Sequence, residues 1–163
     1  AEATKETALP AIACPDISSV LWGKLLLNLV NPINALAGIP IKATLADRDH
    51  RTRYMLAYTE ALHIMRAAKI TPAKVAPLPP ALIPWVLGCP DCLFRSVVLP
   101  LQRLEPDATT SMAQDLAAGR ETEIDWLNGA VVDLAQSMQM QAPQNAALVA
   151  EIKAVSAQSG PRI

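Results

Sequence analysis

Residues 21–31 carry apolar side chains around almost the whole circumference of a helix and polar side chains along one line. At roughly 100° per residue, Lys24, Asn28 and Asn31 fall within about 40° of that line, and leucines with Val30 fill the remainder. A helix that is apolar all round is a buried helix. We therefore expect this helix to be buried and its polar line to face a partner, a cavity or a ligand, because an unpaired buried polar group is costly.

Two interpretations of this polar line remain open. A lysine that loses its hydration gives up its proton more readily, which is typical of an active site. Lys24, Asn28 and Asn31 could equally form a hydrogen-bonded network in the core or a seam between packed helices. The pattern alone does not choose between the two.

The apolar pattern also predicts where the first helix begins and ends. Asp16 or Ser18 is a suitable amino-terminal cap, and the helix should reach about Asn31, where Pro32 kinks or ends it. A further turn is expected to close at Gly38.

The remaining apolar positions recur with a helical period, and no stretch alternates with the period of two that is typical of a strand. Further helices are expected over residues 49–69, over 111–118, from Ile124 to Met138, and from Pro143 onward. The predicted fold class is all-α. We expect one helical domain over residues 16–163, after a lead-in or linker of residues 1–15.

Residues 70–106 hold eight of the 14 prolines. Between the prolines, the apolar residues favour short helices around 82–87 and 93–99. The segment is too apolar for a flexible linker, so we expect it to pack on the body of the domain.

Composition narrows the classes of partner. The chain has 163 residues, enough for one domain with a substantial core, and 52% of them are hydrophobic. A net charge of −1 and 4% aromatic residues argue against nucleic acid or an anionic membrane surface. No apolar run is expected to approach the roughly 20 residues that span a bilayer, because the longest candidate, Leu25 to Val30, is interrupted by Asn28. We expect neither a nucleic-acid nor a membrane partner.

The amino end is polar and lacks an initiator methionine and a secretory signal, which indicates an internal segment of a longer polypeptide or a trimmed piece. Three cysteines do not form a disulfide framework, so we expect a reducing, cytoplasmic location. The sequence contains no glycine-rich phosphate loop, no serine-hydrolase elbow and no zinc-protease motif.

The run Cys89-Pro90-Asp91-Cys92 has the spacing of redox and zinc sites. A zinc site needs more ligands, and Cys14, His50 and His63 are the other soft or imidazole donors. We therefore expect no metal site and interpret the two cysteines as small apolar residues in a packed turn.

Several isolated polar residues have both a structural and a functional interpretation. His63 and Glu60 are expected to be surface or structural residues, and Glu121 is expected to face water. Glu123 begins the helix that contains Ile124, where a carboxylate either caps the amino terminus or serves a site. Ser111 is likewise either an amino-terminal cap or a site residue.

The candidate residues fall in segments that resemble a known family. These segments are the run from Asp16 to Asn28, Pro143-Gln144-Asn145, and the block Ser111–Gly129, which reads S-M-x-x-D-L-x-x-G-R-x-T-E-I-D-x-L-N-G. Over about residues 16–155 they resemble the carboxy-terminal domain of ketopantoate reductase (2-dehydropantoate 2-reductase). That resemblance implies the helical fold of the carboxy-terminal domain of 6-phosphogluconate dehydrogenase. It also implies an amino-terminal Rossmann domain, absent from this chain, that binds NADPH.

The resemblance also implies a role for each candidate. Lys24 would be the catalytic lysine, Asn28 and Ser111 would bind the substrate, and Glu123 would lie near the lysine and the nicotinamide ribose, as both a catalytic and a cofactor-binding residue. Asn31 would also bind substrate, although Asn31-Pro32 comes one residue earlier than the family pattern places it. The implied reaction reduces ketopantoate to pantoate, a step of pantothenate and coenzyme A biosynthesis.

Two alternatives stand beside this assignment. One is a related enzyme that acts on another 2-keto acid. The other is a helical module for dimerisation or ligand binding without catalysis, in which the Lys24 line is sealed in the core or an interface. Under the enzyme hypothesis the partners are a 2-keto acid, the Rossmann domain of the same polypeptide and, as a candidate, a second copy of the chain. This chain alone is expected to be inactive.

Overall fold

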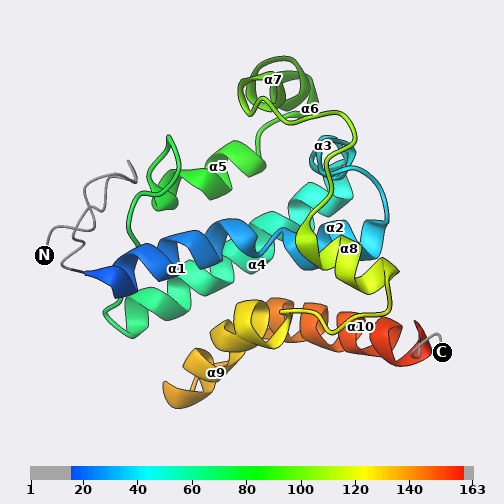
Figure 1. Cartoon of the computed structure of the whole chain (residues 1–163). Coiled ribbons are helices and arrows are strands. Elements are labelled where there is room, and N and C mark those ends of the chain that lie inside the picture. Colours follow the sequence, from blue (N-terminus) through cyan, green and yellow to red (C-terminus); the bar gives the residue numbers. More distant parts are fainter. Residues whose placement is uncertain (1–15, 160–163) are drawn as a thin grey trace, which may run out of the picture.

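The computed structural model describes residues 16–159, which form helices joined by turns and contain no strand. This confirms the all-α fold class. In chain order the elements are α1 (Ile17–Asn28), α2 (Asn31–Ala37), α3 (Ile41–Ala46), α4 (Arg48–Ala67), the 3₁₀ turn η1 (Pro80–Leu82), α5 (Ile83–Leu87), α6 (Asp91–Leu93), the π-helical turn η2 (Phe94–Val98), α7 (Leu99–Leu101), α8 (Ser111–Ala117), the π-helical turn η3 (Asp125–Gly129), α9 (Ala130–Ser137) and α10 (Pro143–Ser159). In Figure 1 they form three tiers, with α5–α7 above, α1, α2 and α4 in the middle, and α9 and α10 below.

The predicted start of the first helix is confirmed, whereas α1 ends at Asn28, three residues before the predicted end, and Asn31 begins α2. Asp16 caps α1, because its carboxylate accepts a hydrogen bond from the backbone N–H of Ser19 at 3.0 Å. Pro32 lies in the first turn of α2, where a missing N–H costs nothing, and Gly38 ends α2 with a φ of 63°.

Because Pro32 opens a new helix rather than ending the apolar run, Ile17–Ala37 extends over 21 residues with a mean hydropathy of 1.2. By length and composition alone this segment could cross a bilayer, so the expectation that no apolar run approaches that length was wrong. A core helix of a soluble protein meets the same criterion, and Leu26, Leu29 and Ile33 of this segment have no exposed surface.

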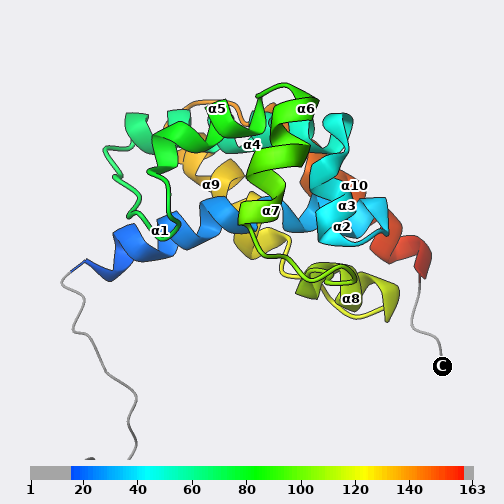
Figure 2. The same cartoon turned by 90° about the horizontal axis from the view of Figure 1, so that it is seen from above.

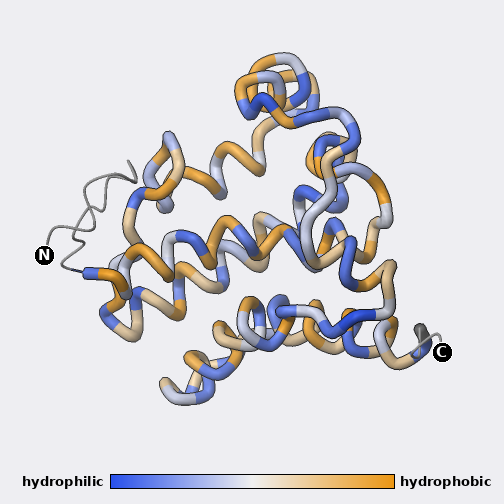
Figure 3. Tube along the Cα trace, in the orientation of Figure 1, coloured by the Kyte–Doolittle hydropathy of each residue, from blue (hydrophilic) through white to orange (hydrophobic). Residues whose placement is uncertain are grey.

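The expectation that this helix is buried all round was also wrong. Leu26 and Gly23 on one side of α1 are buried, whereas Leu21 is 59% exposed and Lys24 is exposed on the other side. Figure 3 shows that α1 is hydrophobic along most of its length. The sequence supplies leucines to both sides, but the described part of the chain covers only one of them.

The helix α4 lies at the centre of the core. Tyr54, Tyr58, Ala61 and Met65 are buried, as their helical spacing predicts, and the two tyrosine rings meet edge to face at 5.8 Å. The Tyr54 hydroxyl donates to the backbone carbonyls of Leu26 and Leu27, each at 3.3 Å. This single proton, shared between the two carbonyls, joins α4 to the end of α1. Burial raises the pKa of both tyrosines.

The proline-rich segment forms short helices near the predicted positions, and it does pack on the body. Its Leu87, Phe94 and Leu99 belong to the main core. Other residues stay outside, and Trp85 is 81% and Leu101 76% exposed. The packing prediction is therefore confirmed for one side of this segment only.

Arg51 attaches this segment to α4, and nothing in the sequence analysis singled it out. It is 1% exposed, and its guanidinium donates to the carbonyls of Leu87 at 2.9 Å and Leu45 at 3.1 Å. It also forms an ion pair with Asp91 and lies 4.3 Å from the centre of the Phe94 ring. A hydrogen bond from Arg51 holds the pKa of the Asp91 carboxyl below its usual value.

The carboxy-terminal helices also follow the prediction, with one correction at a cap. Thr110, not Ser111, caps α8, because its side chain accepts from the backbone N–H of Ala113 at 3.3 Å. The long helix expected from Ile124 begins as the π-helical turn η3 and continues as α9. Pro143 opens α10, as predicted.

Candidate functional site

The candidate catalytic lysine lies on the uncovered side of α1. Lys24 is exposed, and Asn28, one turn later, is half-buried. Asn31, the first residue of α2, is half-buried as well. The three residues therefore lie between the core and solvent, which differs from the sealed arrangement that a core network would require.

Ser111 and Glu123 come from the opposite end of the chain and are both exposed. Ser111 is the first residue of α8. Glu123 lies in the turn before η3, where its backbone carbonyl accepts from the N–H groups of Trp126 and Leu127 at 3.1 Å. Glu121 and His63 are exposed, as expected.

The structure places these segments along one side of the molecule. In Figure 2, α1 and α8 both lie toward the lower edge of the view. Within residues 16–159 no side-chain hydrogen bond or ion pair joins any two of Lys24, Asn28, Asn31, Ser111 and Glu123. Their convergence on one substrate remains a prediction.

A close backbone contact fixes α1 next to Lys24. The N–H of Ala73 donates to the carbonyl of Ser19 at 2.8 Å. One turn later, the segment after α4 passes so near Gly23 that a methyl group there would collide with the Ala73 carbonyl oxygen. Gly23 is therefore required by this contact. The family-like run Trp22-Gly23-Lys24 is the signal in the sequence for it.

Asn34 is a second residue that the sequence analysis missed. It is fully buried in α2 and contacts three other segments through its side-chain amide. The amide donates to the Ile39 carbonyl at 2.7 Å and to the Thr44 hydroxyl at 2.9 Å. Its oxygen accepts from the backbone N–H of Thr110 at 3.0 Å. The polar residue within the apolar α2 was the available signal.

A third network joins η3 to α4 and α10. The Asn128 amide donates to the Asn145 oxygen at 2.9 Å, and the Asn145 amide donates to Glu60 at 2.8 Å and to the Ala57 carbonyl at 3.1 Å. Asn128 and Asn145 are fully buried. Within residues 16–159 the Asn128 oxygen is a buried atom without a hydrogen-bond donor. Glu60 is thus a structural residue, in line with its expected role.

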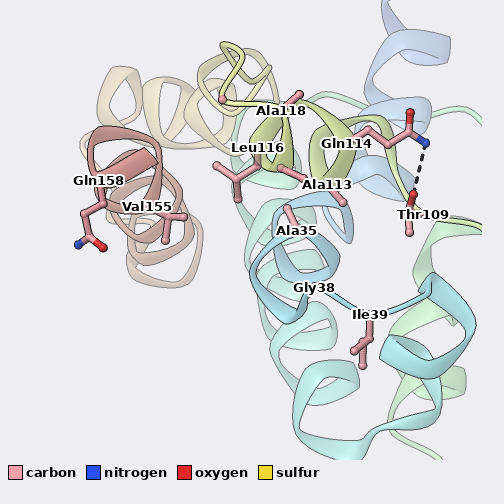
Figure 4. A pocket seen from close by; sticks show the side chains of 12 residues that line it. Ala35, Gly38, Ile39, Thr109, Ala113, Gln114, Leu116, Ala118, Val155 and Gln158 are labelled. Carbon is pink, nitrogen blue, oxygen red and sulfur yellow. Dashed lines mark hydrogen bonds between the residues drawn. The ribbon is translucent and has the colours of Figure 1, made fainter. Parts of the chain in front are cut away.

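A hollow of about 940 Å³ lies elsewhere, between the end of α2, α8 and the end of α10. Figure 4 shows Thr109 and Gln114 at one side of it, Gln158 at the other, and Leu116 and Ala35 between them. None of the five candidate site residues lines it. This hollow is therefore not the predicted substrate site.

The C-x-x-C run, Cys89 to Cys92, contains Asp91, which forms the ion pair with Arg51. Cys89 is half-buried against the core, as expected for a packed turn, whereas Cys92 is exposed, and both are free thiols. Among residues 16–159 no cluster of three or more histidine, cysteine or acidic side chains could hold a metal ion.

Residues 16–156 match the family model described as "Ketopantoate reductase PanE/ApbA C terminal". The chain belongs to this family. Its fold also fits the carboxy-terminal domain type of 6-phosphogluconate dehydrogenase, as the resemblance implied. A curated relative, the 2-dehydropantoate 2-reductase of Pyrococcus abyssi (strain GE5 / Orsay), is 38% identical over 52 residues, which cover 32% of this chain and 17% of the relative.

Solved structures of the family have the same fold. The ketopantoate reductase from Ralstonia eutropha JMP134 has a TM-score of 0.65 at 22% identity, over 85% of this chain and 41% of its own. The dimeric ketopantoate reductase from Staphylococcus aureus has a TM-score of 0.68 at 16% identity, over 91% of this chain and 46% of its own.

A third similar structure is a ternary complex of D-mandelate dehydrogenase with NADH and anilino(oxo)acetate. Its TM-score is 0.69 at 16% identity, over 90% of this chain and 43% of its own. The chain thus spans less than half the length of each of these three proteins.

Proposed function

We propose that this chain is the substrate-binding and catalytic half of a cytoplasmic, NADPH-dependent 2-dehydropantoate 2-reductase, which reduces ketopantoate to pantoate for pantothenate and coenzyme A synthesis. The observation that carries the proposal is the position of Lys24, exposed on the uncovered side of α1 in a chain of the ketopantoate reductase family. A network in the core would bury this lysine, so its exposure argues against that form of the helical module, and the family match favours the enzyme over a module whose Lys24 line meets another chain.

Lys24 would act on the substrate carbonyl. Negative charge develops on the C2 oxygen of a 2-keto acid as the carbon is reduced, and the lysine ammonium would stabilise that charge and donate a proton to the oxygen. The side chain is exposed and unpaired within residues 16–159, so it is free to reach a ligand on this side of α1.

Three polar residues, Asn28, Asn31 and Ser111, would bind the substrate and fix its orientation. Their amide and hydroxyl groups are of the type that binds a carboxylate or hydroxyl without adding charge. The two asparagines are half-buried, and their side-chain amides make no hydrogen bond within residues 16–159, which leaves these groups available. Such contacts align the ketone with its reaction partners.

Glu123 would pair with Lys24 when the site is complete. Both side chains are exposed, and neither has an ion-pair partner within residues 16–159. A carboxylate near the lysine favours the charged ammonium, which the proton transfer requires. The same carboxylate would accept a hydrogen bond from a ribose hydroxyl of the cofactor.

The described residues could bind the nicotinamide ribose of a dinucleotide but not its phosphates. Residues 16–159 contain no glycine-rich loop that could hold the phosphates, whereas Glu123 suits a ribose. We therefore assign NADPH, the source of the hydride, mainly to an amino-terminal Rossmann domain of the same polypeptide. Ile17 and Leu21, 61% and 59% exposed beside Lys24, are apolar surface that such a domain would cover.

Another 2-keto acid is the second candidate substrate. D-mandelate dehydrogenase has the same helical fold and was solved with anilino(oxo)acetate, so the fold alone does not choose ketopantoate. The early position of Asn31-Pro32 bears on the same question, because it changes where this amide meets the substrate. A second copy of the chain is a further candidate partner, since the Staphylococcus aureus relative is dimeric.

The proposal is tested on the polypeptide as it is made in the cell. We expect its mass to exceed that of residues 1–163, and we expect NADPH oxidation with ketopantoate. Lys24→Ala should lower kcat by roughly 10²–10⁴ without unfolding the protein. Lys42→Ala, at another exposed lysine in α3, is the matched control. A natural protein that leaves NADPH untouched with several 2-keto acids would contradict the proposal.

A further inference from the structure

The side chain of Asn34 is a fully used hydrogen-bonding group in the core. Its amide nitrogen donates to the Ile39 carbonyl at 2.7 Å and the Thr44 hydroxyl at 2.9 Å. Its oxygen accepts from the Thr110 backbone N–H at 3.0 Å and the Thr110 hydroxyl at 3.1 Å. A backbone N–H only donates and a carbonyl only accepts, so these partners leave one orientation for the amide.

Thr110 is held at two points by this amide and in turn begins α8. Its hydroxyl donates its single proton to Asn34 and accepts from the backbone N–H of Ala113 at 3.3 Å. Nearby, the N–H of Ile41 donates to the Ala108 carbonyl at 2.8 Å, which attaches the same segment to α3. The direction of the first turn of α8 therefore depends on α2 and α3.

The next residue along the chain is Ser111, at the first position of α8. Asn31 lies one turn before Asn34 on α2, and α2 and α8 pack against each other. The amide of Asn34 thus connects α2, which carries Asn31, to Thr110, which directly precedes Ser111. A rotation of α8 would move the Ser111 hydroxyl relative to Asn31.

We propose that Asn34 is a positioning residue: through Thr110 it holds Ser111 at a set place relative to Asn31, and so determines how tightly the 2-keto acid binds between them. The inference rests on the proposed function for the role of Ser111. Asn34 itself is fully buried and acts through its neighbours, without touching the substrate.

The test uses the full natural polypeptide and variants that change one hydroxyl. Thr110→Val keeps the shape of the side chain and removes the hydroxyl that meets Asn34, whereas Thr110→Ser keeps that hydroxyl. Thr109→Val removes the neighbouring exposed hydroxyl, which has no bond to Asn34, and is the matched control. KM and kcat for ketopantoate and the thermal unfolding midpoint are measured for each.

We expect Thr110→Val to raise KM about fivefold or more with little change in kcat, because a contact made equally in the ground and transition states is lost. Thr110→Ser and Thr109→Val should keep KM within about twofold of the parent. In a Ser111→Ala background, Thr110→Val should raise KM no further, because the group that it positions is already gone. A variant that merely loosened the fold would raise KM equally in both backgrounds.

Two failures are distinguishable. If Ser111→Ala raises KM but Thr110→Val leaves it unchanged, or if the two effects add, the positioning role of Asn34 is overturned and the proposed function stands. If Ser111→Ala leaves KM unchanged in an active reductase, the substrate role of Ser111 and this inference are both overturned. Asn34→Leu, in which the Thr110 hydroxyl and N–H lose their acceptor, should raise KM at least as much as Thr110→Val.

Discussion

Glu60 caps a helix that begins far from it in the sequence. Its carboxylate accepts from the backbone N–H of Asn145 at 2.9 Å and from the side-chain amide of the same residue at 2.8 Å. The N–H of Gln144 donates to the other oxygen at 3.0 Å. One side chain of α4 thereby satisfies the free N–H groups at the start of α10 and orients the buried amide of Asn145.

This contact predicts a measurable loss of stability for Glu60→Gln. Glutamine has one oxygen where the glutamate presents two, and it lacks the charge that favours a helix amino terminus. We expect the free energy of unfolding in urea to fall by about 1–2 kcal/mol. Glu121→Gln, at an exposed position, should leave it within about 0.5 kcal/mol of the parent. Equal losses in both variants would show that the cap contributes nothing specific.

Gly23→Ala is expected to destabilise the protein although alanine favours helices. The added methyl group would meet the Ala73 carbonyl oxygen, so α1 or the segment after α4 must move. We expect a loss of about 1–3 kcal/mol in thermal or urea unfolding. Ser18→Ala, at an exposed position of the same helix, is the control. An unchanged or raised stability would mean that the two backbones separate without cost.

The ion pair of Arg51 and Asp91 predicts acid sensitivity. The pKa of Asp91 is lowered, chiefly by its hydrogen bond from Arg51 and further by the charges of Arg51, Arg48 and Arg95. A carboxyl with a lowered pKa stabilises the folded state above its unfolded pKa, and that contribution is lost as the pH falls through the folded value, here below 3.8.

Unfolding by urea as a function of pH measures this effect. From neutral pH to below 3.8, the parent should lose more stability than Asp91→Asn, which has no such carboxyl to protonate. Asp133→Asn, whose exposed side chain forms no ion pair within residues 16–159, should follow the parent. Parallel curves for the parent and Asp91→Asn would contradict the prediction.

Residues 1–163 expressed alone should not oxidise NADPH. The described residues present no loop for the cofactor phosphates, so the dinucleotide should bind weakly or not at all. Titration of NADPH by fluorescence and a turnover assay with ketopantoate measure the two parts of this prediction. Detectable turnover by this chain alone would show that the assignment of the cofactor to another domain is wrong.

Most of the helices could be predicted because their signals are local. The cap at Asp16, the left-handed Gly38 and the opening Pro143 each act within a few residues, and the structure confirms all three. Predictions that depended on distant partners fared less well. Ser111 was a candidate cap, but Thr110 takes that role because Asn34 holds it from another helix.

Burial was the quantity that the pattern predicted least well. The leucines around α1 indicated a helix covered on every side, whereas Leu21 and Lys24 face outward. Hydropathy indicates whether a side chain is more stable when it is buried. Whether it is buried depends on how many other helices pack around it. Arg51 is the opposite case, a charged residue on a helix that proves fully buried, since carbonyls and Asp91 satisfy its guanidinium.

The sequence by itself determined the helical class, most helix ends and the family, because periodicity, caps and the block Ser111–Gly129 are all read along the chain. Only the tertiary structure decided that Lys24 lies open to solvent, that Glu60 caps α10, and that Asn34 connects α2 to the start of α8. Each of these depends on residues brought together from distant segments. A tertiary hydrogen bond or a buried surface forms only when folding brings the two segments that make it into contact, and the pattern of one segment does not show where the other will lie.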